Sequence, residues 1–426
     1  MILRFRNILL TTLLLLFFLS GCGFEPGLSR DKKPPLSADI IVVGDGIGGL
    51  VASLEASRKG AAVIIFSGEP LAEDWLWEEG ALCPEERADG RSFEDFLDDA
   101  GRMGYQKWHL TLICERAAGD LEWLSRETGL KFSQEAPQRC LPANLSYDQV
   151  HRRLWESLQR EGVRFIEGAV LEELLIQGGE ISGVGFTDPA GVYNHIYAPA
   201  VILADGGFLD DQAWVEELAP GTAVAPWRSG GGESLKLARE AGLDLVEESR
   251  FAYTLAAEKR QGWMPVETPP RALAVVDEEL IPLSPDRETE LVQMLAKSPS
   301  SRGYMLLSGA GLKEKEEPDW PRYSDIGAFM EDCALELPEL ERYFRKGRSE
   351  IFAVRIKAVA SYCLGGIAVD ETGRVLRNEE PVEGLYALGE AAGALNGKTI
   401  IPGFPLTEAL VWGRRLGSTA CRLLEP

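Results

Sequence analysis

The sequence predicts an α/β protein built on a parallel sheet, and three observations support this class. Residues 40–43 form a short apolar run typical of a buried strand, and a helical pattern follows it directly. A second apolar run, 62–66, comes after that helix, as in a strand–helix–strand unit. Further strand patterns at 170–176 and 181–186, and a buried run at 197–203, extend the sheet.

The first residues are predicted to be a targeting segment rather than part of the fold. Two arginines precede an apolar run over 8–19, which is too short to span a bilayer, and small residues follow. The motif Leu19-Ser20-Gly21-Cys22 resembles the lipobox of bacterial lipoproteins. That resemblance implies a lipoprotein signal peptide over 1–21 and acylation of Cys22. An ordinary secretory signal or an uncleaved anchor remain the alternatives.

Residues 22–37 contain three prolines and mixed charges, and they predict a flexible tether. One acyl chain holds a protein only marginally, so stable attachment needs a second chain. The expected location is therefore the bacterial cell envelope, on its periplasmic or extracellular face. Contact with the membrane is expected through the lipid anchor only.

Composition excludes several functions. The formal net charge of −23 argues against nucleic acid as a partner. The six cysteines after Cys22 form no C-x-x-C pair, and the chain has only three histidines, so no metal site is expected. Export would permit disulfides, although a core of this size does not need them.

A glycine-rich turn directly after the first strand predicts a dinucleotide site. Gly44, Gly46 and Gly49 have G-x-G-x-x-G spacing, and the helix opens at about Ile47. Gly44 permits the tight turn, Gly46 lets a pyrophosphate approach the backbone, and Gly49 allows close packing of helix on strand. The helix N-terminus offers free N–H groups and partial positive charge to the phosphates.

The rest of the chain divides into two kinds of segment. Residues 248–351 alternate prolines, charges and short apolar runs without a strand–helix rhythm, which predicts a separate, inserted domain. The remaining patterns predict a Gly178-Gly179 hairpin, a helix stop at Gly129, a strand at 163–166, and helices at 92–131, 147–162, 233–242 and 407–424.

Several separated motifs agree with one family. They are Leu121-Glu-Trp-Leu-Ser-Arg-Glu-Thr-Gly129, Val201-Ile-Leu-Ala-Asp-Gly-Gly-Phe208, Gly232-Glu-Ser-Leu-Lys-Leu-Ala238, Leu364-Gly-Gly-Ile367, Gly384-Leu-Tyr-Ala-Leu-Gly-Glu390 and Ala409-Leu-Val-Trp-Gly413. With these motifs the chain resembles the flavoprotein subunits of fumarate reductase and succinate dehydrogenase, and their relatives the ketosteroid dehydrogenases, aspartate oxidase and urocanate reductase. The likeness covers residues 38–426 and is weakest over 248–351.

The resemblance implies a Rossmann-like FAD-binding domain with a mixed sheet, over 38–247 and 352–426. An inserted α+β capping domain over 248–351 would carry the substrate. The cofactor would be FAD, held noncovalently because no histidine stands where some members link it.

The resemblance also assigns roles to individual residues. Gly44, Gly46, Ile47 and Gly49 would face the pyrophosphate, and Val170 would contact adenine through its backbone. Further FAD contacts would come from Ala204 and Gly206 at a strand end, Glu390 at the sugar hydroxyls, and Leu406 with the following helix N-terminus at the pyrimidine edge.

Two positions on the cofactor side depart from the family pattern. Ser67, with Glu69 two residues on, stands where a family acid binds the adenosine ribose. Asp205 stands where threonine is frequent, and its carboxylate would repel a pyrophosphate unless it points away.

The substrate side departs further. Ser361 replaces the histidine, and Ile400 the arginine, with which dicarboxylate members hold substrate. Without a bidentate arginine a carboxylate is poorly bound, so fumarate and succinate are not the expected substrates. Residues expected to shape the substrate site are Tyr253, Tyr362, Lys398 and Arg287, of which Arg287 is equally well explained as a solvated surface residue.

The expected function is that of an FAD-dependent oxidoreductase of the cell envelope. It would transfer hydride at flavin N5 to or from a carbon of a small organic substrate, next to a carbonyl-type group. A second interpretation is an electron-transfer module that has lost its substrate site and exchanges electrons with an envelope carrier. A scaffold that binds no flavin is the third.

Overall fold

The structure of this 426-residue chain is a computed structural model. The described residues are 36–68, 80–82, 93–136, 139–225, 232–259, 262–266, 272–277, 279–282, 288–298, 303–309, 320–344, 350–393, 395–398, 400–401 and 403–425. The chain divides into the units Met1–Leu36 and Ser37–Pro426, and the elements below belong to the second, apart from Leu36 in β1 (Leu36–Ser37). The predicted signal peptide and most of the tether, with Cys22, Glu69 and Arg287, lie outside the described residues.

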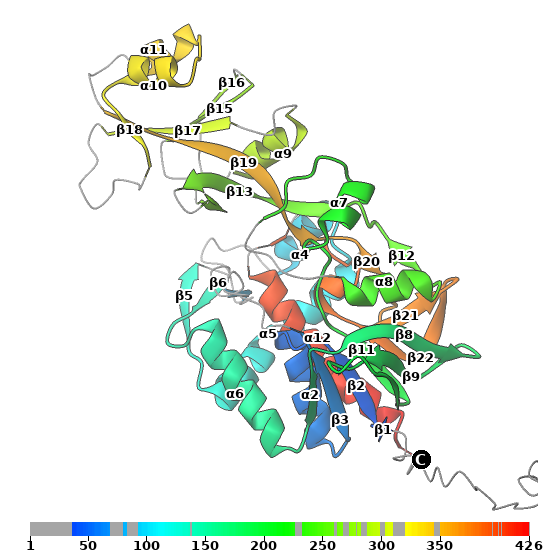
Figure 1. The fold of residues 1–426 in the computed structure, drawn as a ribbon. Helices are drawn as coiled ribbons and strands as arrows, with labels where there is room; N and C mark the ends of the chain where they lie inside the picture. The colour runs from blue at the N-terminus through cyan, green and yellow to red at the C-terminus, as the bar shows by residue number, and fades with distance from the viewer. Residues whose placement is uncertain are drawn as a thin grey trace, which may run out of the picture. The chain divides into compact units, whose positions relative to one another are not determined.

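The predicted strand–helix–strand unit is present as β2 (Ile40–Val43), α2 (Ile47–Arg58) and β3 (Val63–Ser67) (Figure 1). The strands β2 and β3 are parallel, and every residue of both is buried. Burial on both faces explains why the two strands are continuous apolar runs rather than alternating patterns.

The main sheet contains both parallel and antiparallel pairs, so the predicted mixed sheet is confirmed. Its order from β10 onward is β10-β9-β22-β11-β2-β3-β7, with β8 beside β9 and β21 beside β22. The pairs of β2 with β11 and β3, and of β11 with β22, are parallel, whereas β9 is antiparallel to β8 and β10. The remaining bounds are β7 (Arg164–Glu167), β8 (Val170–Gln177), β9 (Glu180–Thr187), β10 (Tyr193–Tyr197), β11 (Ala200–Leu203), β21 (Arg374–Arg377) and β22 (Glu380–Ala387).

Turn residues set the strand boundaries in this sheet. Gly178 and Gly179 both have positive φ, at 61° and 88°, and they form the predicted hairpin turn between β8 and β9. The prediction of one strand over 197–203 is wrong. Pro199 separates β10 from β11, because proline donates no ladder hydrogen bond, and the two strands pair with different neighbours.

Helices cover the parallel strands, and some begin or end differently from the sequence prediction. The predicted helix at 92–131 is two helices, α4 (Phe93–Arg102) and α5 (Lys107–Thr128), because Gly104 turns the chain with φ 93°. The stop at Gly129 is confirmed, since this residue caps α5 in the left-handed conformation. A Ser146–Gln149 capping box starts α6 (Tyr147–Arg160). The last helix, α12 (Phe404–Arg422), begins three residues before the predicted start.

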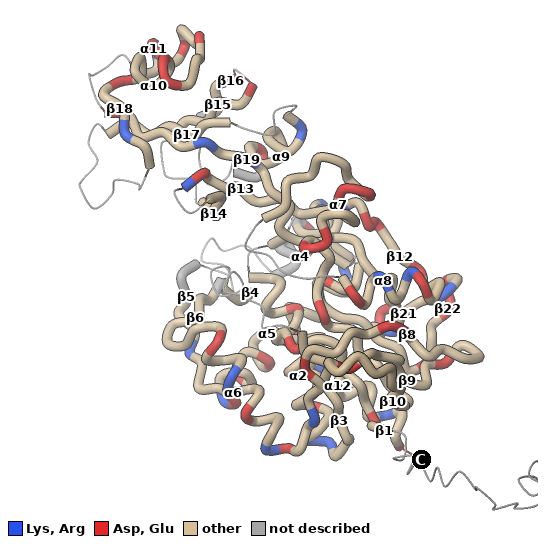
Figure 2. The backbone as a smooth tube through the Cα atoms, viewed as in Figure 1, with Lys and Arg blue, Asp and Glu red and all other residues tan. Residues whose placement is uncertain are grey.

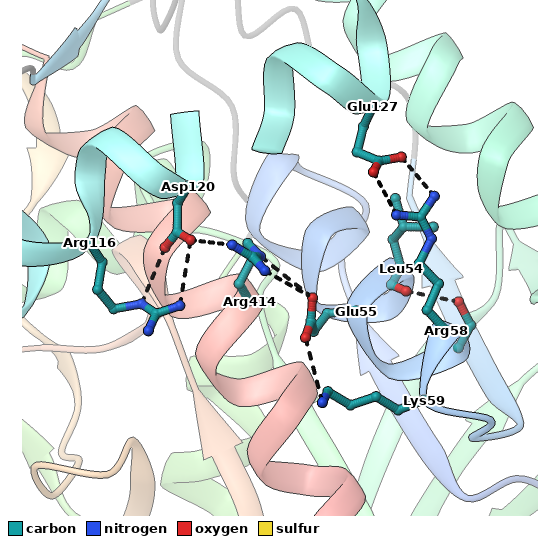
Figure 3. Close-up of polar contacts among 9 residues, drawn as sticks. Leu54, Glu55, Arg58, Lys59, Arg116, Asp120, Glu127 and Arg414 are labelled. Atoms are coloured by element: carbon teal, nitrogen blue, oxygen red, sulfur yellow. Dashed lines mark hydrogen bonds and ion pairs between the residues drawn. The ribbon is translucent and has the colours of Figure 1, made fainter. Parts of the chain in front are cut away.

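Close packing and charge hold α12 against α2 and α5. A Cβ at Gly413 would lie 2.6 Å from the Gly48 oxygen, so only glycine allows α12 to approach α2 here. Arg414 of α12 bridges Asp120 of α5 and Glu55 of α2, and its guanidinium is 3.5 Å from the Glu55 carboxylate (Figure 3). The N-termini of α2 and α12 are therefore fixed relative to each other.

Residues between 251 and 363 form a second sheet, and each of its described strand pairs is antiparallel. Its order is β14-β13-β19-β17-β15-β16, with β18 also beside β19. The strand β19 begins at the predicted boundary, residue 351, but it pairs within this second sheet and runs on to Cys363. The bounds are β13 (Phe251–Lys259), β14 (Gly262–Pro265), β15 (Leu273–Val276), β16 (Glu279–Pro282), α9 (Glu288–Lys297), β17 (Gly303–Ser308), β18 (Arg322–Tyr323), α10 (Ile326–Asp332), α11 (Pro338–Phe344) and β19 (Ile351–Cys363).

Smaller elements connect these parts. They are β4 (Ala81–Leu82), β5 (Phe132–Ala136), β6 (Arg139–Pro142), α7 (Gln212–Leu218), α8 (Glu233–Glu240), β12 (Leu245–Val246), β20 (Gly366–Ile367) and the 3₁₀ turn η3 (Gly389–Ala391).

Acidic residues occur on α7 and α11, among other elements (Figure 2). Within the described part of the chain, no helix has the length and apolar character needed to cross a bilayer.

Candidate FAD-binding site

The glycine-rich turn has the geometry of a phosphate site. Gly44 has φ 103°, and a Cβ there would lie 2.4 Å from the Ala204 oxygen. A Cβ at Gly49 would lie 2.1 Å from the Gly44 oxygen, so both positions require glycine. Gly46 caps α2 without a side-chain hydrogen bond, and the first turn carries no acid. The backbone N–H groups of Gly46 and Ile47 are thus available to an anion.

Ser67 ends β3 beside this turn, and its hydroxyl has no partner in the part of the chain that the structure describes. The residue is 4% exposed, and among the described residues its Oγ has no hydrogen-bond partner. A buried hydroxyl without a partner is costly, whereas a bound ribose hydroxyl would satisfy it. The departure at this position therefore still fits an adenosine ribose.

Three further predicted contacts lie at or just beyond strand ends. Val170 opens β8 and is 53% exposed, an unusual exposure for a valine that an adenine ring would reduce. Ala204 follows β11 and donates its N–H to the Val43 oxygen at 2.8 Å. Gly206 has φ 83°, and a Cβ there would meet no atom within 4 Å, so the backbone conformation is what favours glycine.

Asp205 turns its carboxylate to the N-terminus of α8. Its Oδ2 accepts the Ser234 N–H at 2.9 Å, while its Oδ1 is buried with no partner among the described residues. Burial raises the pKa of Asp205 to about 6, with a smaller contribution from the nearby Glu233 charge and against the opposing hydrogen bonds from Ser234. The carboxylate thus has a hydrogen-bond partner of its own at the N-terminus of α8.

Glu390 joins η3 to the end of β19. Its Oε1 accepts the Cys363 N–H at 2.6 Å, and a Cβ at Gly207 would lie 2.5 Å from the same oxygen. The Cys363 Sγ accepts the Phe208 N–H at 3.4 Å. The second sheet therefore reaches the predicted sugar contact of FAD through Cys363.

The N-terminus of α12 is held by the short strand β4. Gly403 caps the helix with φ 80° and no side-chain cap, and its oxygen accepts the Leu82 N–H at 2.9 Å. The same N–H lies 2.9 Å from Thr407 Oγ1. Leu406 lies inside the first turn, rather than before the helix, and is fully buried. Next to β4, Cys140 of β6 is disulfide-bonded.

The residues predicted to shape the substrate site come from different parts of the chain. Tyr253 of β13 packs on the core of the second sheet. Tyr362 of the neighbouring strand β19 is 3% exposed and clusters with Ala252 of β13 and with Leu364. Lys398 is exposed, and its N–H donates to the Met103 oxygen. These three roles, like that of Arg287, stay predictions.

Ser361 and Ile400, which stand where dicarboxylate members have their substrate-binding histidine and arginine, lie beside the same group of residues. Ile400 packs against the cluster of Ala252, Tyr362 and Leu364. The Ser361 Oγ donates to the Ala252 oxygen at 3.4 Å and so is directed to the backbone. In place of a histidine and an arginine, this part of the chain has a mostly buried apolar cluster with Ile400 at its edge.

Sequence reasoning missed a buried polar cluster under α12. His109 Nε2 lies 2.8 Å from Glu408 Oε1, Trp412 Nε1 donates to His109 Nδ1 at 3.1 Å, and Tyr362 Oη donates to Glu408 Oε2 at 3.3 Å. The signal available in the sequence was a single acid within the apolar stripe of the last helix. Elsewhere in the described residues, no three His, Cys, Asp or Glu side chains gather as a metal site would require.

The chain combines parallel strands, a glycine turn and a helix N-terminus without a side-chain cap, and within the described residues the hydroxyl at the next strand end has no partner. This combination is typical of a dinucleotide-binding protein. The chain belongs to the family described as FAD binding domain, whose model matches residues 39–261 and 323–403. The gap in this match falls within the predicted capping domain.

Curated relatives agree with this family. The chain is 22% identical over 449 residues to the NADH:fumarate oxidoreductase of Klebsiella pneumoniae strain 342, covering 91% of this chain but only 48% of that protein. It thus spans about half the length of that relative. It is 25% identical over 406 residues to the L-aspartate oxidase of Pyrococcus furiosus, covering 90% of this chain and 78% of the relative.

Solved structures share the fold. An open conformation of a flavocytochrome c3 fumarate reductase aligns with TM-score 0.74 and 18% identity, over 92% of this chain and 80% of the other. The 3-ketosteroid-Δ4-(5α)-dehydrogenase of Rhodococcus jostii RHA1 aligns with TM-score 0.70 and 19% identity, over 92% and 99%. The cofactor of this chain is FAD, and the protein is an FAD-dependent oxidoreductase.

Proposed function

We propose that this oxidoreductase acts on an uncharged, cyclic organic molecule at a carbon next to a carbonyl-type group, and not on fumarate or succinate. The observation that carries the proposal is the apolar cluster of Ala252, Tyr362, Leu364 and Ile400. Relatives named as fumarate reductases and ketosteroid dehydrogenases have related sequences or the same fold, so both substrate classes fit the architecture.

The argument against a dicarboxylate is electrostatic. A substrate carboxylate taken from water needs charged donors, and a bidentate arginine supplies them best. At the corresponding positions Ile400 offers none, and the Ser361 hydroxyl is engaged with the Ala252 oxygen. An apolar ring would instead gain from leaving water against Ile400, which is the half-buried member of this cluster.

Residues of this chain would hold and orient the cofactor. The α2 N-terminus would bind the pyrophosphate, Ser67 the ribose, and Glu390 a sugar hydroxyl. When bound, FAD supplies hydride transfer at N5. The buried N-terminus of α12 would stabilise negative charge at the pyrimidine edge.

Ligand titration of the purified, FAD-loaded protein tests the substrate class. Cyclohexenone and 4-androstene-3,17-dione should perturb the visible absorbance of the bound flavin, whereas fumarate and succinate should not. The double variant Ser361→His/Ile400→Arg should gain a response to fumarate, and Ser361→His alone should not. A response of the unaltered protein to dicarboxylates alone would contradict the proposal.

A second candidate is an electron-transfer module that has lost its substrate site and passes electrons to an envelope carrier. This candidate is favoured because Ser361 and Ile400 stand where dicarboxylate members have the histidine and the arginine that hold substrate. Stopped-flow reoxidation separates the two. Turnover with a small ketone or enone supports the enzyme, and rapid reoxidation only by a haem or quinone carrier supports the module.

We also propose that the protein is exported and anchored through acylated Cys22. The apolar run over 8–19 and the lipobox-like motif support this, and so does the disulfide at Cys140, since disulfides persist in oxidising compartments. Metabolic labelling with palmitate should mark the unaltered protein in the membrane fraction. Cys22→Ala should lose the label and leave the membrane fraction, and a label retained by this variant would sink the proposal.

A further inference from the structure

His151 of α6 contacts the glycine-rich turn, although it is not among the residues expected to bind FAD. Its Nε2 lies 2.9 Å from the backbone oxygen of Asp45, the residue between Gly44 and Gly46. The same nitrogen is 3.8 Å from Asp45 Oδ2, which is too far for a hydrogen bond. The hydrogen bond of His151 to this turn is therefore made to the backbone.

The chemistry of this contact identifies its donor. A carbonyl oxygen can only accept, so the hydrogen must be on His151 Nε2. The cationic imidazole and the neutral form with its hydrogen on Nε2 both satisfy this condition. The direction of the bond thus does not depend on the charge of the ring, and His151 donates to the peptide that joins Asp45 to Gly46.

That peptide connects His151 to the anion-binding end of α2. The described residues have no cis peptide bond, so the Asp45 C=O and the Gly46 N–H point in opposite directions. A hydrogen bond that holds the oxygen toward α6 therefore directs the N–H away from α6. In the part of the chain that the structure describes, no oxygen accepts this N–H. It is one of the groups that the N-terminus of α2 offers to an anion.

Packing along α6 orients the imidazole. Tyr147, His151 and Trp155 are spaced by four residues and so lie on one face of the helix. The His151 ring is 5.9 Å from the Tyr147 ring and 5.8 Å from the Trp155 ring, which itself stacks on Phe165 of β7 at 3.7 Å. An imidazole held between two rings has little rotamer freedom left to lose when it forms the bond.

We propose that His151 is a positioning residue for the pyrophosphate of FAD: its hydrogen bond to the Asp45 oxygen fixes the peptide whose Gly46 N–H faces the phosphates. The inference rests on the proposed function, in which the N-terminus of α2 binds the pyrophosphate. A peptide that is already fixed binds an anion more tightly than one that must first be ordered. A donor on the carbonyl oxygen also polarises the peptide and strengthens its N–H.

Calorimetric titration of ADP into the FAD-free, full-length protein tests the proposal, because ADP carries the adenosine and the pyrophosphate of FAD without the flavin. His151→Phe keeps a ring on this face of α6 but loses the donor, so ADP should bind about three- to tenfold more weakly. His151→Gln should restore binding to within about twofold of the unaltered protein, since its amide N–H can take the place of Nε2–H.

Two further variants separate this hydrogen bond from other effects. Trp155→Phe alters the packing one turn further along α6 and should leave the ADP affinity unchanged. Asp45→Asn removes the carboxylate but keeps the backbone oxygen that accepts from His151. It should bind ADP at least as tightly as the unaltered protein, because a carboxylate in the turn opposes an anion. The free energy of unfolding in urea is measured for each variant in parallel.

Equal ADP affinity in His151→Phe and the unaltered protein overturns the inference, and so does a His151→Gln variant that fails to restore binding. An equal loss in Trp155→Phe would indicate general loosening of α6, and an equal loss in Asp45→Asn would assign the effect to the carboxylate; either result also overturns it. If His151→Phe does not fold, His151→Asn takes its place, because its shorter amide does not reach the position of Nε2. An unaltered protein that binds neither ADP nor FAD would instead refute the proposed function.

Discussion

Replacing Asp205 by asparagine should stabilise the protein at alkaline pH and have little effect at acid pH. The Oδ1 of this carboxylate is buried without a partner among the described residues, and burial raises its pKa from its usual value near 3.8 to about 6. At about pH 8 the unfolded chain ionises Asp205 freely, whereas the folded chain must ionise it in a buried position.

The size of the effect follows from linkage. A raised folded-state pKa contributes stability that is complete below the unfolded value and is lost as pH rises through about 6. About two units at roughly 1.36 kcal/mol each give a cost of up to about 3 kcal/mol above that range. The amide side chain of Asp205→Asn keeps an oxygen for the Ser234 N–H, so the variant should recover most of this free energy at about pH 8.

Urea unfolding of the FAD-free protein at about pH 4 and pH 8 measures this difference. Asp211 provides a control of opposite sign, because its hydrogen bond with Lys236 lowers its pKa and its Oδ1 caps α7 at the Trp214 N–H. Asp211→Asn keeps an N-cap oxygen but loses the charge that faces Lys236, so it should destabilise the protein at pH 8 by roughly 0.5–1 kcal/mol. If Asp205→Asn destabilised the protein equally at both pH values, the reasoning about its buried charge would be refuted.

Three further outcomes are expected. Ser67→Ala should weaken FAD binding about five- to tenfold, without lowering the stability of the FAD-free protein, because the hydroxyl has no partner in the described part of the chain; calorimetry and thermal unfolding measure both, and a destabilised apoprotein would contradict this. Gly49→Ala should abolish FAD uptake, since its Cβ would lie 2.1 Å from the Gly44 oxygen; normal retention of flavin would argue against the turn. Arg414→Met should cost roughly 1 kcal/mol in urea unfolding, because Asp120 keeps Arg116 and Glu55 keeps Lys59 as partners; an unchanged free energy of unfolding would show that the bridge is dispensable.

Local signals were sufficient for the elements that hold the cofactor. The run at Ile40–Val43, the glycine spacing and the next apolar run predicted β2, α2 and β3 because each depends on neighbours in sequence. Gly178 and Gly179 predicted the hairpin for the same reason. The motifs at Ala204 and Glu390 narrowed the dinucleotide site to FAD only through a family resemblance.

Features that depend on distant residues were not predicted. Pro199 ends one strand and precedes another, but the sequence does not show that β10 and β11 choose different partners. Glu408 meets His109 across 299 positions of the chain, and neither residue carries a local mark of this contact. The direction of the Asp205 side chain likewise depends on α8, which follows 28 residues later.

The visible absorbance spectrum of the purified protein, taken before and after denaturation, shows whether this chain holds FAD. We expect a flavin spectrum in the folded protein, and we expect the flavin to move to the soluble fraction as FAD once the protein is denatured. A colourless protein that also fails to take up added FAD would contradict the assignment of Gly44–Gly49, Ser67 and Glu390 as a noncovalent FAD site.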